Sequence, residues 1–82
     1  MTIVSAAEIE QIIKDFKQVQ VLPEQKLVSS GFLDSFDIIN LIDRLERRFN
    51  ITVGGEDFNL NNFDDVASIT SLIQKLQSSK SP

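Results

Sequence analysis

The sequence predicts a small all-α protein built as a single helical bundle. Three segments repeat apolar residues at intervals of three and four, the spacing of a helix that buries one side. The chain has 82 residues, the size of one domain, and 41% of them are hydrophobic, which is enough for a compact core. The sequence contains no internal repeat, low-complexity tract or linker. We therefore expect residues 1–82 to form one domain.

The first helix should run from about Ser5 to Gln18. Ser5 and Glu8 have the spacing of a capping box, in which the serine oxygen accepts a backbone N–H and the glutamate side chain reaches back. The apolar stripe of this helix consists of Ile9, Ile12, Ile13 and Phe16. Residues 1–4, which lie ahead of the helix or at its start, should fray.

A long connection follows, from Val19 to Asp34. It contains Pro23 and Gly31, and loops of this length tend to be functional or packed by their own side chains. Its apolar residues, which we expect to lie on the core, are Val21, Leu22, Leu27, Val28, Phe32 and Leu33. The stretch from Glu24 to Val28 is compatible with a short helical turn.

The second helix should run from about Ser35 to Phe49, with Asp34 or Ser35 as its N-cap. Its buried stripe consists of Ile38, Leu41, Ile42, Leu45 and Phe49. The opposite side carries Phe36, Asn40, Asp43 and Arg47, with Ile39 on the shoulder. Large apolar residues that lie off the core stripe suit a docking surface. The alternative is that Phe36 and Ile39 cover the long connection or a neighbouring helix.

Between the second and the last helix we expect one irregular turn. Asn50 suits the left-handed position that ends a helix, and Gly54 and Gly55 suit a turn. From Glu56 to Asp65 the apolar pattern is too short for a full helix. The expected anchors of this turn are Phe58, Leu60 and Phe63.

The last helix should begin after Asp64 or Asp65, either of which can cap it. Its apolar stripe consists of Val66, Ile69, Leu72, Ile73 and Leu76. Residues 78–82 should fray. We expect a free-standing protein rather than a module of a larger synthase.

Charge and composition exclude several classes of function. The net charge is −4, which argues against a nucleic-acid partner, because phosphates require clustered lysines and arginines. The chain has no cysteine and no histidine, and its acidic residues do not follow a calcium-loop pattern, so we predict no metal site. No charged and apolar leader and no apolar run of about 20 residues is present. We expect a cytoplasmic protein without a membrane span.

Ser35 is the only candidate nucleophile that stands out, and the sequence gives it no catalytic partners. Without a histidine, a base would have to be a lysine or a carboxylate, and no G-x-S-x-G elbow surrounds the serine. We expect Asp34 and Asp37 to be exposed, with ordinary pKa values, and therefore to be poor bases at neutral pH. We predict no catalytic residue and no enzymatic activity; a small hydrolase is the weakest of the alternatives.

The residues around Ser35 carry a family resemblance. Asp34-Ser35-Phe36 places a serine between an acid and a large apolar residue, in a stretch that begins at Gly31 and continues to Ile42. With Phe49-Asn50-Ile51 and the segment from Asn62 to Val66, this pattern resembles the phosphopantetheine attachment site of acyl and peptidyl carrier proteins. The resemblance covers nearly the whole chain. It implies a four-helix bundle with three longer helices and a short third one.

The resemblance also implies a function. A phosphopantetheinyl transferase would join 4′-phosphopantetheine to Ser35 Oγ, and the thiol of this arm would hold an acyl or aminoacyl cargo as a thioester. The partners would be that transferase, the loading enzymes and downstream transferases or synthases, which meet a monomeric carrier. A docking face for them would comprise Asp34, Phe36, Ile39, Asn40, Asp43 and Arg47. Backbone N–H groups at the helix start favour the phosphodiester, whereas Asp34 and Asp37 oppose it.

The charges of the second helix depart from one branch of this family. Carriers for fatty acid synthesis commonly have a strongly acidic second helix, whereas residues 34–49 here hold four acids and three arginines, a net charge of −1. We therefore expect a specialised pathway of the polyketide, nonribosomal peptide or D-alanyl type. The charges could instead be a solvated face of pairs three or four residues apart, joining Asp37, Asp43 and Glu46 to Arg44, Arg47 and Arg48. The competing function is an unmodified helical interaction module that uses Phe36 and Ile39, with Ser35 as an N-cap only.

Overall fold

Three α-helices account for about half of the chain: α1 (Ala6–Lys17), α2 (Ser35–Phe49) and α3 (Val66–Ser79). The structure is a computed structural model that describes residues 4–79. Two 3₁₀ turns, η1 (Gly55–Asp57) and η2 (Leu60–Phe63), lie between α2 and α3. Within the described residues no strand occurs, so the all-α prediction is confirmed.

The helices enclose one apolar core. Helix α1 packs on both α2 and α3, and η2 packs on α3. The buried residues of the helices are Ile9, Ile13, Ile38, Leu41, Leu45, Phe49, Val66, Ile69, Leu72 and Ile73. All of them belong to the predicted stripes. Residues at the edges of those stripes pack against the core but remain partly exposed; they are Ile12, Phe16, Ile42 and Leu76.

The helix boundaries lie within one residue of the predicted ones for α1 and α2. Ser5 caps α1 by accepting a hydrogen bond from the Glu8 N–H at 3.3 Å, as predicted. The predicted return contact of the capping box, from the Glu8 side chain back to the start of the helix, was wrong. The Glu8 carboxylate instead accepts a hydrogen bond from Arg48 at 3.0 Å. Asn50 ends α2 in the left-handed conformation, with φ of 54°, as predicted.

The region between α2 and α3 differs from the expectation. In place of one irregular turn or a short third helix it contains η1 and η2, separated by extended backbone at Asn59. The Asn59 side chain accepts a hydrogen bond from the Asn61 N–H at 2.9 Å and so caps η2 as a separate turn. Of the three predicted anchors only Phe63 is buried, whereas Phe58 and Leu60 are about half exposed. Ile51 supplies the further apolar contact with the core.

The ends are more regular than expected. Val4 is buried in the core, and α3 continues through Ser79, so the predicted fraying was wrong at position 4 and at positions 78 and 79. Residues 1–3 and 80–82 lie outside the described residues.

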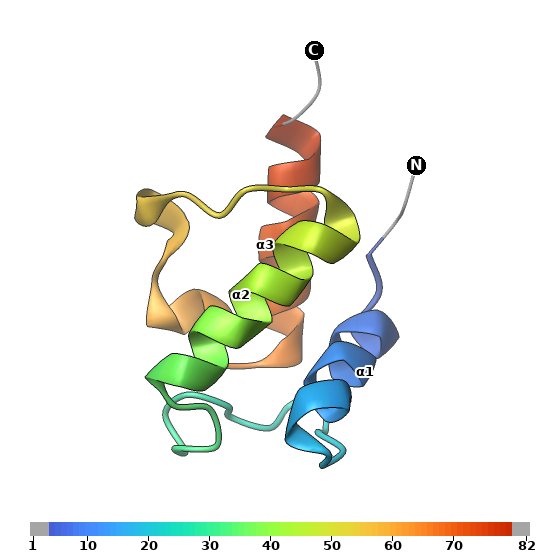
Figure 1. Cartoon of the computed structure of the whole chain (residues 1–82), viewed down its shortest axis with the longest axis vertical. Coiled ribbons are helices and arrows are strands. Elements are labelled where there is room, and N and C mark those ends of the chain that lie inside the picture. The colour runs from blue at the N-terminus through green and yellow to red at the C-terminus, as the bar shows by residue number, and fades with distance from the viewer. Residues whose placement is uncertain (1–3, 80–82) are drawn as a thin grey trace.

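The long connection runs along one end of the bundle, from the end of α1 to the start of α2 (Figure 1). The segment with η1 and η2 lies on the other side of α2 from α1 (Figure 1). The start of α2, which bears Ser35, is therefore at the end of the bundle where the connection lies.

Candidate functional site around Ser35

The connection that leads to Ser35 is anchored by three buried apolar side chains. Val21, Leu27 and Leu33 are almost completely buried, whereas Leu22 is 65% exposed, so the prediction that all six apolar residues lie on the core was wrong for Leu22. The expected helical turn is absent from the segment 24–28. A turn closed by Gln25 N–H and the Leu22 carbonyl, at 3.1 Å, takes its place, since Pro23 directs the chain into a turn.

Backbone hydrogen bonds close the second half of the connection. The Leu33 N–H donates to the Leu27 carbonyl at 2.7 Å, and the Gly31 N–H donates to the Val28 carbonyl at 3.0 Å. Gly31 has a φ of +83°, a conformation that costs an L-residue and that glycine adopts without strain. The loop therefore returns the chain to the core immediately before Asp34.

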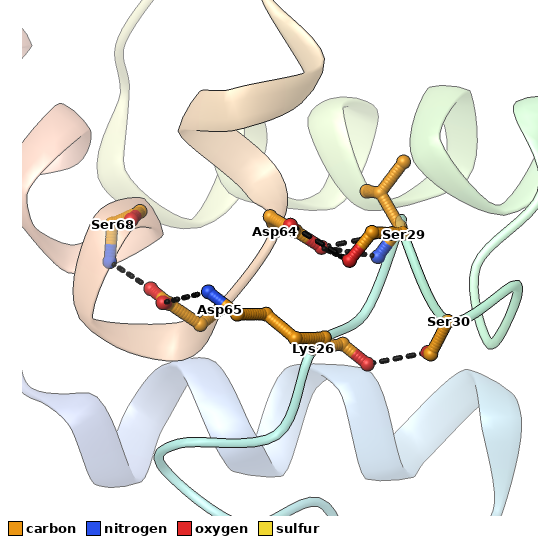
Figure 2. A network of polar contacts seen from close by, with 7 residues as sticks. Lys26, Ser29, Ser30, Asp64, Asp65 and Ser68 are labelled. Atoms are coloured by element: carbon orange, nitrogen blue, oxygen red, sulfur yellow. Dashed lines mark hydrogen bonds and ion pairs between the residues drawn. The ribbon is translucent and has the colours of Figure 1, made fainter.

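Asp64 holds this loop from the segment ahead of α3 (Figure 2). Its Oδ1 accepts the N–H groups of Val28 and Ser29, both at 2.9 Å, and the Ser29 hydroxyl donates to Oδ2 at 3.0 Å. These bonds, with that of the Ser29 N–H as the largest cause, lower the pKa of Asp64 below its usual value. The Asp64 carbonyl also accepts the Leu27 N–H at 2.7 Å.

Asp65, rather than Asp64, caps α3 (Figure 2). Its Oδ1 accepts the Ser68 N–H at 2.8 Å, and its Oδ2 lies 3.6 Å from Lys26 Nζ. The hydrogen bond from Ser68 is the main reason that the pKa of Asp65 is lowered. The two adjacent acids therefore have different roles: Asp65 caps α3, and Asp64 binds the connection.

Asp34 is the N-cap of α2, and this leaves Ser35 as the first helical residue. The Asp34 carboxylate accepts the Asp37 N–H at 2.9 Å, and the Asp37 carboxylate accepts the Asp34 N–H at 3.1 Å, which completes a capping box. Ser35 is exposed, and its Oγ makes no hydrogen bond to any residue between 4 and 79. The reading of Ser35 as the cap is therefore wrong.

The first turn of α2 has room for an anion. Neither the Ser35 N–H nor the Phe36 N–H has an acceptor among the described residues, because their positions precede the first intrahelical bonds. Unpaired N–H groups at a helix start attract negative charge, by about 0.3–1 kcal/mol at an exposed site. The geometry at Ser35 therefore fits a phosphodiester on its oxygen.

Asp37 differs from the sequence prediction. Its side chain is only 21% exposed, and its Oδ2 lies 2.9 Å from Lys17 Nζ at the end of α1. The hydrogen bond from Lys17 is the largest cause that lowers the pKa of Asp37, so the prediction of an exposed acid with an ordinary pKa was wrong. A carboxylate with a lowered pKa is an even poorer base.

The outer face of α2 is apolar near Ser35. Phe36 is 83% exposed and Ile39 is 59% exposed, so neither covers the connection or a neighbouring helix. Further along this face Asn40, Asp43 and Arg47 are also exposed, as predicted. Asp34, the residue immediately before Ser35, is exposed as well.

The charges of α2 pair differently from the prediction. Of the ion pairs predicted within α2, only that between Asp43 and Arg47 forms, at 3.3 Å. Glu46 accepts the Val53 N–H at 2.9 Å. Arg44 lies over the Phe16 ring at 5.1 Å and donates to Asn40, and Arg48 pairs with Glu8. The sequence could not reveal these contacts, because most of them join α2 to other segments.

Two further properties of the described residues bear on function. Among residues 4–79 no group of three or more histidines, cysteines or acids could hold a metal ion. None of the helices in this part of the chain is both long and apolar enough to cross a membrane.

The fold and this site define a carrier-type domain. The family model of the phosphopantetheine attachment site matches residues 7–74, and the chain therefore belongs to this family, whose domain is the site of 4′-phosphopantetheine attachment. No curated protein matches the sequence at a significant level.

A solved structure gives a more particular likeness. The chain is similar to a carrier protein in the "Crystal structure of Bradyrhizobium japonicum glycine:[carrier protein] ligase complexed with cognate carrier protein and an analogue of glycyl adenylate". The TM-score is 0.74 and the identity is 26%, and the match covers 85% of this chain and 95% of the other. Family and neighbour together support a role as a carrier protein.

Proposed function

We propose that Ser35 is the residue to which 4′-phosphopantetheine is attached. One observation carries this proposal: within a chain matched to the attachment family over residues 7–74, Ser35 stands exposed at the first position of α2 with its Oγ unpaired among the described residues. In the transfer, Ser35 Oγ bonds to the phosphorus next to pantetheine in coenzyme A. The bond from that phosphorus to adenosine 3′,5′-bisphosphate breaks, and the hydroxyl proton passes to a base of the transferase.

The protein's own residues present and tolerate the attached group. The free N–H groups of Ser35 and Phe36 would be available to the anionic end of the arm, and the Asp34–Asp37 capping box keeps this turn fixed. When bound, the arm supplies a thiol that holds an acyl or aminoacyl group as a thioester. This chemistry is absent from the chain itself, which has no cysteine.

We propose further that the cargo is an amino acid, loaded by an ATP-dependent ligase through an aminoacyl adenylate. The support is the likeness to a carrier in a complex with its glycine ligase, at 26% identity and over 95% of that carrier. The mixed charges of α2 agree with a specialised pathway of this kind. The carrier would act as a cytoplasmic monomer that meets a phosphopantetheinyl transferase, the ligase and then a downstream transferase or synthase.

Intact mass spectrometry tests the attachment. The apo protein is treated with a promiscuous phosphopantetheinyl transferase and coenzyme A, and the expected product is heavier by one phosphopantetheine. The Ser35→Ala variant should gain nothing, whereas Ser71→Ala, which removes an exposed serine from α3, should be modified like the parent. No added mass, or added mass that survives Ser35→Ala, would reject the proposal. The same measurement on protein from its native host identifies the cargo.

A second function is favoured by the 83% exposure of Phe36. An unmodified interaction module would bind its partner through Phe36 and Ile39 without any group on Ser35. In that case Ser35→Ala would leave function intact and Phe36→Ala would abolish binding. A carrier gives the opposite result for Ser35→Ala, so one pair of variants separates the two functions.

A further inference from the structure

Lys17 joins the end of α1 to the turn that bears Ser35. Its Nζ lies 2.9 Å from Asp37 Oδ2 and 5.1 Å from the centre of the Phe32 ring. Its side chain is only 25% exposed, so the ammonium group is held between the connection and α2 instead of extending into solvent. This placement is not required for the end of α1, because Gln18 closes that helix by donating its N–H to the Lys14 carbonyl.

The partner of Lys17 is itself part of the capping box. Asp37 Oδ2, which meets Lys17, also accepts the Asp34 N–H at 3.1 Å, and Asp34 is the residue immediately before Ser35. One carboxylate oxygen therefore connects Lys17 to the backbone next to the serine. The cation has two effects there: it fixes the Asp37 side chain, and it offsets one of the two negative charges on this turn.

We propose that Lys17 is a positioning residue for the modification of Ser35. This proposal rests on the proposed attachment at Ser35. It adds to the same site a residue that is far from the Asp-Ser-apolar motif in the sequence. Lys17 acts through Asp37: it holds the first turn of α2 in place and keeps that turn from repelling the phosphate of the incoming coenzyme A.

Removing the charge of Lys17 should slow the transfer. As the bond from Ser35 Oγ to phosphorus forms, the phosphate lies close to the capping box, and an uncompensated Asp37 carboxylate would oppose it. A partly exposed charge contact of this kind corresponds to a change of about threefold to fivefold in kcat/KM. We therefore expect Lys17→Met to lower kcat/KM by that factor, while Lys17→Arg stays within about twofold of the parent.

The experiment measures kcat/KM for phosphopantetheine transfer from coenzyme A on the full apo chain. Lys14→Met is the matched control, since it removes the same charge from the same helix at an exposed position. It should stay within about twofold of the parent. The decisive comparison is made in an Asp37→Asn background, which keeps an acceptor for the Asp34 N–H and removes the charge. There Lys17→Met should have almost no effect, and circular dichroism verifies that each variant is folded.

Three outcomes would overturn the proposal. They are Lys17→Met at the parent's rate, Lys14→Met as slow as Lys17→Met, and a loss by Lys17→Met that is undiminished in the Asp37→Asn background. If Lys17→Met alone fails to fold, Lys17→Arg and the double variant Lys17→Met/Asp37→Asn still decide: a rate more than about twofold below the parent for the first, or below Asp37→Asn for the second, would overturn the proposal. Failure of the proposed function gives a different result, in which the parent itself gains no phosphopantetheine.

Discussion

Leu27 and Leu22 provide a direct test of whether the connection that leads to Ser35 is anchored in the core. The two residues are of the same type and belong to the same loop, but Leu27 has no exposed surface whereas Leu22 is 65% exposed. Truncating a fully buried leucine removes its transfer free energy and leaves a cavity, at a cost of about 2–5 kcal/mol. The Leu27 backbone bonds to Asp64 and Leu33 do not involve the side chain and survive the change. Leu22→Ala should cost less than about 0.5 kcal/mol.

This loss is large for a protein of this size. A chain of 82 residues has a free energy of unfolding of roughly 4–12 kcal/mol, so Leu27→Ala should remove a substantial share of it. Urea unfolding followed by circular dichroism, at about 15 °C where stability is near its maximum, measures both variants. Equal losses for the two leucines, or a loss below about 1 kcal/mol for Leu27→Ala, would refute the claim that the connection is anchored in the core.

Three other predictions concern the caps, acid and docking. Asp34→Ala should lower the free energy of unfolding by about 1 kcal/mol through loss of the N-cap of α2, as urea titration would show. The pKa values of Asp37, Asp64 and Asp65 are all lowered, so their stabilising contribution is present above their ordinary value of 3.8 and is lost as the pH falls through the folded values. The free energy of unfolding should thus begin to fall near about pH 5 as acid is added. Asp64→Asn should reduce the slope of this free energy against pH. Finally, Phe36→Ala should weaken binding to a loading ligase by about tenfold or more, whereas raising the salt from about 0.1 to 1 M should change the dissociation constant of the parent by less than about threefold, as calorimetry would measure.

The helices could be predicted from the sequence because each has an apolar stripe that the core requires. For α1 and α2 the caps agreed as well, since Ser5, Asp34 and Asn50 act on their own helix ends through local contacts. Local contacts depend on spacing along the chain, which a sequence displays directly. The edge positions, such as Ile42, were harder to place because a stripe does not show how far the neighbouring helix extends over it.

The contacts between segments could not be predicted in this way. By their spacing, Asp64 and Asp65 are equally suitable as caps of α3. Asp64 instead binds Val28 and Ser29 because the fold brings the connection next to it, which the spacing does not show. Phe58 and Leu60 have the composition of anchors, yet the break at Asn59 leaves both about half exposed. Lys17 lies in the last turn of α1, and its spacing along the chain does not indicate a partner in α2. Its contact with Asp37, twenty residues away, depends on how α1 meets α2.

The same tertiary contacts change the interpretation of the charges on α2. By sequence, four acids and three arginines form a helix of mixed charge that could attract or repel a partner at several points. In the structure Asp37 is paired with Lys17, Arg48 with Glu8 and Asp43 with Arg47. Arg44 and Glu46 contact neutral groups of the described residues instead. Asp43 and Arg47, which already contact each other on the outer face, gain little from a basic patch on a ligase, because such a patch would have to compete with the existing contact. Phe36 and Ile39 are then the groups on this face that gain most from leaving water, and they lie directly beside Ser35.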